Sequence, residues 1–333
     1  MVLLVGLMCA LGVSAQSALI ATLMHGDEIS TFQSSEALKQ AYEKAVDGDV
    51  ITLSSGTFNA PTPITKAITI RGAGMMAYDG AKTNPTNISG ICTVKDIESG
   101  LELNIESVRF LSKIYIDNAP GLVNFTKILT DKIVEIGGTN TDYVNVRMVH
   151  CIIAYDSPSS SGLSLSLMQS TSMVSFINSY ILISGVSAKA GSFRYDNCFL
   201  TTNSYYGLDY LVKHHLRNCV IESRQNTKLS SSSTANGCIY VGSANFFANC
   251  APELNKSFPE DTPIFKEGTQ TYELTDENQK NWIGTDGTQV GMHGGNLPFD
   301  PAVDAPVISK FNVASKTTAD GKLSVDIEVK AAE

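Results

Sequence analysis

Residues 193–202 read "FRYDNCFLTT", and close variants of this phrase recur as "VRMVHCIIAY" (146–155), "VSFINSYILIS" (174–184), "HLRNCVIES" (215–223) and "NFFANCAPE" (245–253). Each phrase centres on one polar residue, which a small residue follows directly. The polar residues are His150, Asn178, Asn197, Asn218 and Asn249. The small residues after them are Cys151, Ser179, Cys198, Cys219 and Cys250. The repetition indicates a repeated structural unit.

The spacing of the large residues shows that a phrase cannot form one straight strand. A large residue stands two positions before the polar one, as Tyr195 does before Asn197, and the small residue Cys198 stands one position after it. Successive side chains of a strand point to opposite faces, so two residues three positions apart cannot share a face. A bend at the polar residue would let the large residue before it and the small residue after it both face the inside of the coil. We therefore predict a strand, a corner and a second strand in each phrase.

The intervals between the polar residues are 28, 19, 21 and 31 residues, which is typical of solenoids. "LELNIESVRFLS" (101–112) fits the same template at Ser107, two coils before His150. Short β-branched strands with Asn at the corner favour an all-β fold, a single-stranded right-handed parallel β-helix. We expect the asparagines to form a ladder, bonding to each other and to corner backbone groups. The rival solenoid, the leucine-rich repeat, requires an L-x-x-L-x-L pattern that no coil supplies.

The Asn-Cys phrase is interpreted as scaffold and not as a site. Six cysteines follow the first 15 residues: Cys92, Cys151, Cys198, Cys219, Cys238 and Cys250. We expect them to be buried and reduced, because the Cβ vectors of stacked residues run parallel and do not converge on a disulfide. No metal site is predicted, since the cysteines come one per coil instead of in clustered pairs. No pattern calls for a cofactor.

The first 15 residues are an apolar run ending in Val13-Ser14-Ala15, the pattern of a secretory signal peptide, although no Lys or Arg precedes the run. We therefore expect an exported protein, whether periplasmic, on the outer surface or extracellular. The net charge is −9 and the chain has no run of Lys and Arg, which argues against nucleic acid as a partner. No later segment approaches the ~20 apolar residues of a transmembrane span.

Residues 16–262 are assigned to the β-helix, and distinct patterns mark its two ends. Residues 34–47 predict an amphipathic helix that caps the first coil. Its apolar residues at helical spacing are Leu38, Ala41, Tyr42, Ala45 and Val46. Residues 263–305, rich in Gly and Pro, predict a loop or linker. Residues 306–333 predict an antiparallel, hairpin-like β tail, because apolar and polar residues alternate there around a turn signal at Asp320-Gly321.

A short helix, then "DGDVITLSSGTF" (47–58) and "ITKAITIRGAG" (64–74), resembles the opening of the pectin-lyase-like right-handed parallel β-helix superfamily. The chain resembles in particular the exported β-helix proteins of glycan-foraging gut bacteria. The likeness covers roughly residues 30–250 and is specific for fold. It implies polysaccharide as the candidate partner. Lyases of this superfamily neutralise a uronate and remove a proton with Arg or Lys, and its hydrolases need two or more carboxylates at set distances.

The segment richest in chemistry is "NSYYGLDYLVKHHLRNC" (203–219). Tyr rings stack against sugar faces, and Lys or Arg can pair with a uronate or a sulfate. The candidate carbohydrate-binding residues are Tyr205, Tyr206, Tyr210, Lys213 and Arg194. The candidate catalytic residues are Lys213, His215 and Arg217, with Lys213 or His215 as the proton-abstracting base. The alternative interpretation is that Tyr210 belongs to the core and that the cations form a solvated coil face.

Three functions stay open at this point. We expect a secreted or cell-envelope protein without catalytic activity that contacts carbohydrate along one flank. The alternative is a divergent polysaccharide lyase or glycoside hydrolase acting on acidic glycans. A third possibility is a structural, adhesin-like spacer. An enzyme requires three or more ionisable groups from neighbouring coils to converge in a groove, and a flank of Ser, Thr and Asn without that convergence would remove the lyase.

Overall fold

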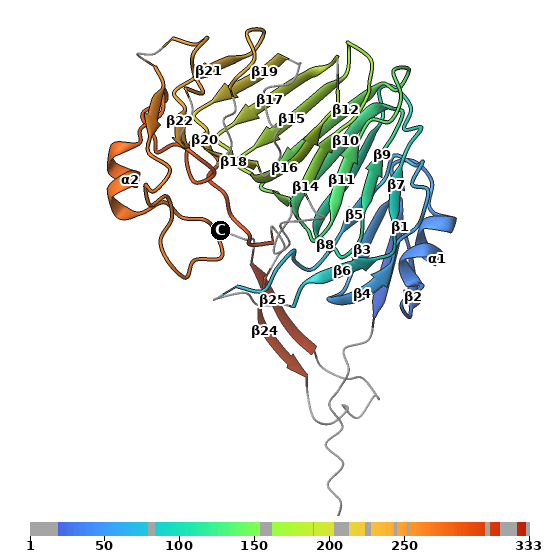
Figure 1. Cartoon of the computed structure of the whole chain (residues 1–333). Coiled ribbons are helices and arrows are strands. Elements are labelled where there is room, and N and C mark those ends of the chain that lie inside the picture. Colours follow the sequence, from blue (N-terminus) through green and yellow to red (C-terminus); the bar gives the residue numbers. More distant parts are fainter. Residues whose placement is uncertain are drawn as a thin grey trace, which may run out of the picture.

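The computed structural model describes residues 19–78, 84–153, 162–188, 190–202, 213–223, 228–242, 245–251, 254–303, 307–313 and 325–330. Its strands wind into a right-handed β-solenoid of about eight stacked turns with very little helix (Figure 1). The repeat in the sequence therefore predicted the architecture correctly. The signal-peptide segment 1–15 lies outside the described residues. None of the helices in the described ranges is long and apolar enough to cross a membrane.

Parallel strands of successive coils pair in three rows, and the first row carries the candidate site. Its strands are β3 (Val50–Leu53), β5 (Thr69–Arg71), β8 (Glu102–Phe110), β10 (Ala119–Thr130), β12 (Val144–Val149), β15 (Met173–Ile177), β17 (Ser192–Asp196), β19 (Lys213–Arg217) and β21 (Thr234–Asn236). Each coil turns a corner at the end of this row and enters the second row.

The second row follows the corner and the third row closes the coils of the N-terminal half. The second row contains β4 (Gly56–Asn59), β6 (Thr86–Ser89), the ends of β8 and β10, β13 (Ile152–Ile153), β16 (Tyr180–Val186), β18 (Phe199–Thr202), β20 (Val220–Ser223), β22 (Ile239–Gly242) and β23 (Lys256–Phe258). The third row contains β7 (Cys92–Val94), β9 (Ile114–Ile116), β11 (Ile133–Ile136), β14 (Gly162–Leu165) and the end of β16.

The corner between the first and second rows falls on the polar residue of each phrase. The backbone there is left-handed, with φ between 45° and 55°, at Ser107, Lys127, His150, Asn178, Asn197 and Asn218. We call these six residues the corner column. Asn tolerates this conformation better than most residues, which explains its recurrence. Lys127 is the corner residue of the coil between Ser107 and His150, for which the sequence template had assigned no residue.

The expected places of Asn249 and Cys250 in the repeat are wrong. Gly237 takes the corner after Asn218, since the Gly237 amide donates to the Leu254 carbonyl as the other corner amides donate to the coil above. Glycine reaches positive φ without strain, and Gly237 has a φ of 68°. Cys238 consequently continues the column of small residues, whereas Asn249 and Cys250 lie in a turn.

Large side chains fill the inside of the coils. Phe176 stacks on Tyr195 of the next coil, with ring centroids 5.1 Å apart and planes 7° from parallel. Such aromatic pairs add about 0.5–1.5 kcal/mol to the free energy gained by burial. The cysteines of the column, Cys151, Cys198, Cys219 and Cys238, are fully buried in this core. They are free thiols, and so are Cys92 and Cys250.

The N-terminal end differs in detail from the expectation. Residues assigned to the β-helix form an antiparallel hairpin, β1 (Ile20–His25) and β2 (Glu28–Gln33), and β1 pairs antiparallel with β3. Helix α1 (Ala37–Lys44) follows and buries Leu38, Ala41 and Tyr42. The helix is shorter than 34–47 because Ala45 is already extended. Val46 is consequently exposed instead of lying on the buried face.

The segment expected to be a loop or linker packs along the outside of the second row (Figure 1). We call residues 263–303 the strap; it contains the short helix α2 (Asp276–Asn281). Its buried Trp282 and Val290 join Phe199 and Val220 in one apolar cluster. A second cluster is formed by Met75, Met76, Leu129, Ile152, Met292 and Phe299. The strap therefore covers the outer face of the second row through two apolar clusters that are separate from the core inside the coils.

The corner column anchors the strap, and this replaces the expected asparagine ladder. Asn178 Nδ2 donates to the carbonyls of Met292 and Gly294, at 2.9 and 2.7 Å. Asn218 Oδ1 accepts from the Thr285 amide at 2.9 Å, and Lys127 Nζ donates to the Ala302 carbonyl at 2.6 Å. No hydrogen bond between two asparagines of the column occurs in the described ranges. Asn178 and Asn218 do bond to backbone groups, but to those of the strap.

The two last strands, β24 (Val307–Val313) and β25 (Val325–Lys330), form an antiparallel pair. This pairing is the arrangement that alternation in residues 306–333 predicted. That α1 caps the first coil of the solenoid stays a prediction.

Candidate functional site

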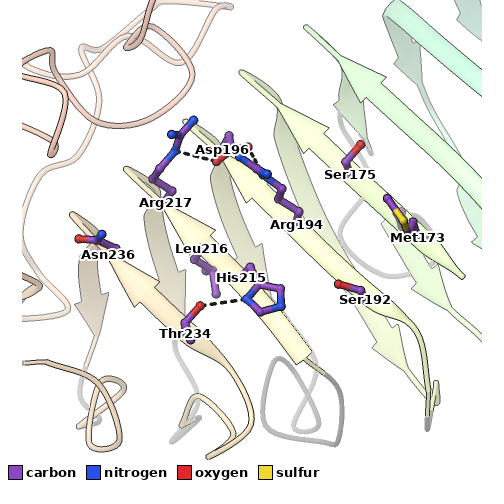
Figure 2. A pocket seen from close by; sticks show the side chains of 11 residues that line it. Met173, Ser175, Ser192, Arg194, Asp196, His215, Leu216, Arg217, Thr234 and Asn236 are labelled. Carbon is purple, nitrogen blue, oxygen red and sulfur yellow. Dashed lines mark hydrogen bonds and ion pairs between the residues drawn. The ribbon is translucent and has the colours of Figure 1, made fainter. Parts of the chain in front are cut away.

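An open groove of about 460 Å³ lies on the outer face of the first row, over β15, β17, β19 and β21. Alternation places one set of side chains inward and the other outward, so the groove floor is made of outward residues. They include Ser175, Arg194 and His215, which lie side by side in register on three neighbouring strands (Figure 2). Met173, whose side chain is more than half exposed, lines one end of the groove.

Asp196 holds two arginines together in this groove. Arg194 Nε donates to Asp196 Oδ2 at 2.5 Å, and Arg217 Nε donates to Asp196 Oδ1 at 2.9 Å (Figure 2). The carboxylate is only 8% exposed, whereas the arginine side chains are 59% and 53% exposed. Both bonds use Nε, and because the two side chains are more than half exposed, their Nη groups are accessible to a ligand. Two guanidinium groups against one carboxylate give this cluster a net positive charge.

His215 lies beside the two arginines. Its Nδ1 is 3.0 Å from Thr234 Oγ1, which fixes the orientation of the ring (Figure 2). Cross-strand pairing puts His215 directly opposite Arg194. The ring thus presents a second nitrogen at the surface of the groove, where it can accept or donate a proton.

The structure brings together most of the cationic residues that the sequence analysis had selected. Arg194 lies on β17, and Lys213, His215 and Arg217 point outward from β19. Lys213 is exposed but does not line the groove. Tyr205, Tyr206 and Tyr210 lie outside the described residues.

Asp196 was missed as a site residue, although the repeat could have revealed it. Aligning the phrases on Asn197 and Asn218 puts Asp196 and Arg217 at the same position, one residue before the corner. Residues at equivalent positions of neighbouring coils are cross-strand neighbours. An acid facing a base at that position was therefore readable from the sequence alone.

A second group of ionisable side chains lies near the ends of third-row strands. Burial raises the pKa of Asp117, and the charges of Asp142 and Glu135 raise it further. Asp142 accepts from the Thr139 amide at 2.7 Å, and Glu135 accepts from Ser166 Oγ at 2.8 Å. No group of three His, Cys, Asp or Glu side chains able to hold a metal ion occurs in the described part of the chain.

The other histidines lie apart from the groove. His214 is fully buried between Phe193 and Tyr195, and burial lowers its pKa to about 3, so it is a neutral core residue. His25 pairs with a carboxylate at the N-terminal end, where its Nδ1 is 2.8 Å from Asp49 Oδ1. This hydrogen bond raises the pKa of His25.

Comparisons with protein-family models, with curated proteins and with solved structures found no match for this chain.

Proposed function

We propose that this chain is an exported, non-catalytic β-helix protein of the pectin-lyase-like type that binds an acidic saccharide in the first-row groove. One observation carries the proposal: Asp196 holds Arg194 and Arg217 side by side with their Nη groups available. Planar guanidinium groups bind carboxylate and sulfate oxygens through paired hydrogen bonds. A uronate or a sulfate ester is therefore the group that this arrangement suits.

The single carboxylate of the groove supports binding over hydrolysis. A glycosidase requires two carboxyl groups flanking the scissile bond, one as acid and the other as base or nucleophile. Asp196 is the only acid among the described residues that line the groove, and both of its oxygens accept from arginines. Acting as a proton donor or nucleophile would require it to break these bonds.

A glycan array tests the proposal. We expect the parent protein to retain glycans that carry uronate or sulfate, and Arg194→Gln and Arg217→Gln each to lower the signal severalfold. Arg71→Gln is the matched control, because Arg71 lies on the same face and pairs with Glu106 at 2.8 Å, far from the groove. Equal signals for the parent and both groove variants would end the proposal. Failure of the parent to retain any glycan would favour the structural spacer.

His215 favours one alternative, a polysaccharide lyase. A lyase needs a cation to neutralise the uronate and a base to remove the proton beside it, and His215 lies directly opposite Arg194. Incubation with uronate-containing polymers separates the cases, since a lyase yields an unsaturated product that absorbs in the ultraviolet. New reducing ends without that absorbance would indicate a hydrolase. Neither signal is expected of a binding protein.

A further inference from the structure

The groove is part of a longer cationic line on the first row. Register places Arg147 on β12, Ser175 on β15, Arg194 on β17 and His215 on β19 opposite one another in turn. All four side chains point outward, and Arg147 is exposed. Arg147 lies two coils before Arg194 and is not among the residues that line the groove. The line therefore extends the positive charge of the groove toward the N-terminal end.

Charge divides this face into two halves. From β12 to β21 the outward residues include four cationic side chains and one carboxylate: Arg147, Arg194, Lys213, Arg217 and Asp196. In the described ranges no carboxylate pairs with Arg147 or Lys213. On β5 and β8 the same face instead carries Arg71 with Glu102 and Glu106. The cationic half is notable because the whole chain has a net charge of −9.

The spacing of the cations excludes a small anion as the ligand of the whole line. Neighbouring strands lie ~4.8 Å apart, so the three steps from β12 to β19 cover roughly 14 Å. One sulfate or carboxylate cannot contact both Arg147 and Arg217 over that distance. A chain with repeated anionic groups can, and each further contact then forms within an already bound molecule.

We infer that the first row takes a linear polyanionic glycan lying along the solenoid axis, in contact with Arg147 as well as with Arg194 and Arg217. This inference rests on the proposed function and adds the length and direction of the ligand. Between the arginines lie Ser175 and Met173, an uncharged surface on which sugar rings can lie. The net charge of −9 and the lack of any run of Lys and Arg argue against nucleic acid, whose phosphates require a broad basic surface. An acidic glycan is therefore favoured over nucleic acid.

Calorimetric titration with uronate oligosaccharides of two lengths tests the inference. A disaccharide is shorter than the line, and a hexasaccharide covers it. We expect the hexasaccharide to bind at least tenfold more tightly to the parent protein, and Arg147→Gln to weaken its binding about threefold to tenfold. Arg147→Gln leaves disaccharide binding unchanged, because the disaccharide stays at Arg194 and Arg217. Arg71→Gln removes an equal charge from the acidic half of the same face. We expect it to leave the affinities for the disaccharide and for the hexasaccharide unchanged.

The outcomes distinguish the inference from the proposed function. If the disaccharide and hexasaccharide bind equally, or if Arg147→Gln and Arg71→Gln have equal effects, the inference fails while the groove remains a binding site. If neither binds and sulfated oligosaccharides of the same two lengths also fail, the proposed function fails with it. Equal affinity for single-stranded DNA of matched length and charge would overturn the choice of a glycan.

Discussion

Asn178 donates a hydrogen bond to the carbonyl of Met292, 114 residues later in the chain, at 2.9 Å. The bond fastens the strap to the corner of a coil. Lys127 and His150 also bond to strap carbonyls, and Asn218 Oδ1 accepts from a strap amide. Strap residues contact the corners in reverse order, so the strap runs back along the solenoid toward its N-terminal end.

Replacement of Asn178 by Asp should loosen the strap. The side chain is 2% exposed, and a carboxylate cannot donate to the carbonyls of Met292 and Gly294. We expect a loss of about 2–4 kcal/mol in the free energy of unfolding, measured by urea denaturation, because a buried charge would face two carbonyl oxygens. Asn249→Asp is the control, since Asn249 is exposed, and should cost less than about 1 kcal/mol. Equal losses would show that the strap is not fastened at Asn178.

Gly237 should tolerate no side chain. Its φ is 68°, and a Cβ atom there would lie 2.4 Å from Asn218 Oδ1. We expect Gly237→Ala to lower the free energy of unfolding by about 2–4 kcal/mol, from backbone strain and the clash together. Gly90 also has positive φ but open space around it, so Gly90→Ala should cost only about 1 kcal/mol. A cost for Gly237→Ala no greater than that for Gly90→Ala would contradict its place in the corner.

The buried cysteines should resist alkylation in the native protein. Burial raises the pKa of the Cys151 thiol to about 12, so almost no reactive thiolate forms at mildly alkaline pH. Cys250 is only partly buried and should react first. Treatment with iodoacetamide, followed by mass-spectrometric mapping, checks the order. Rapid labelling of Cys198 or Cys219 without unfolding would show that the column is open to solvent.

The His25–Asp49 pair should make stability depend on pH at the N-terminal end. Its hydrogen bond raises the pKa of His25 above 6.5. A raised pKa in the folded state means that the pair's contribution is complete below the unfolded pKa and is lost as pH rises through the folded one. We expect the urea midpoint of the parent to exceed that of His25→Gln most at about pH 5 and least at about pH 8. A difference that does not change with pH would refute the coupling.

The sequence predicted the corners at Ser107, His150, Asn178, Asn197 and Asn218 and missed those at Lys127 and Gly237. Left-handed backbone favours Asn and Gly, so Asn178, Asn197 and Asn218 marked their coils, while Gly237 was overlooked in a search for polar residues. The phrase around Asn249 matched by composition and not by position. A template built on polar residues alone misses the corner at Gly237 and accepts the false match at Asn249. It would have to include glycine, which also adopts the left-handed backbone conformation.

The strap escaped prediction for a different reason. Trp282, Val290, Met292 and Phe299 pack on the outer face of a sheet from a segment with little regular structure, so they follow neither helical nor strand periodicity. The groove was predicted in part: the cations were selected, whereas their partner Asp196 becomes apparent only when the neighbouring phrases are aligned with each other. The packing of the strap and the pairing of Asp196 with the arginines both depend on which coils are neighbours. One phrase taken alone does not contain that information.

A crystal structure of the protein with the acidic oligosaccharide that it binds best would test the central claim most directly. The account predicts a carboxylate or sulfate within hydrogen-bond distance of the Nη groups of Arg194 and Arg217, with the glycan on the outward side chains of β15, β17 and β19. A glycan held on the strap or on the third row, with both arginines facing only water, would contradict it.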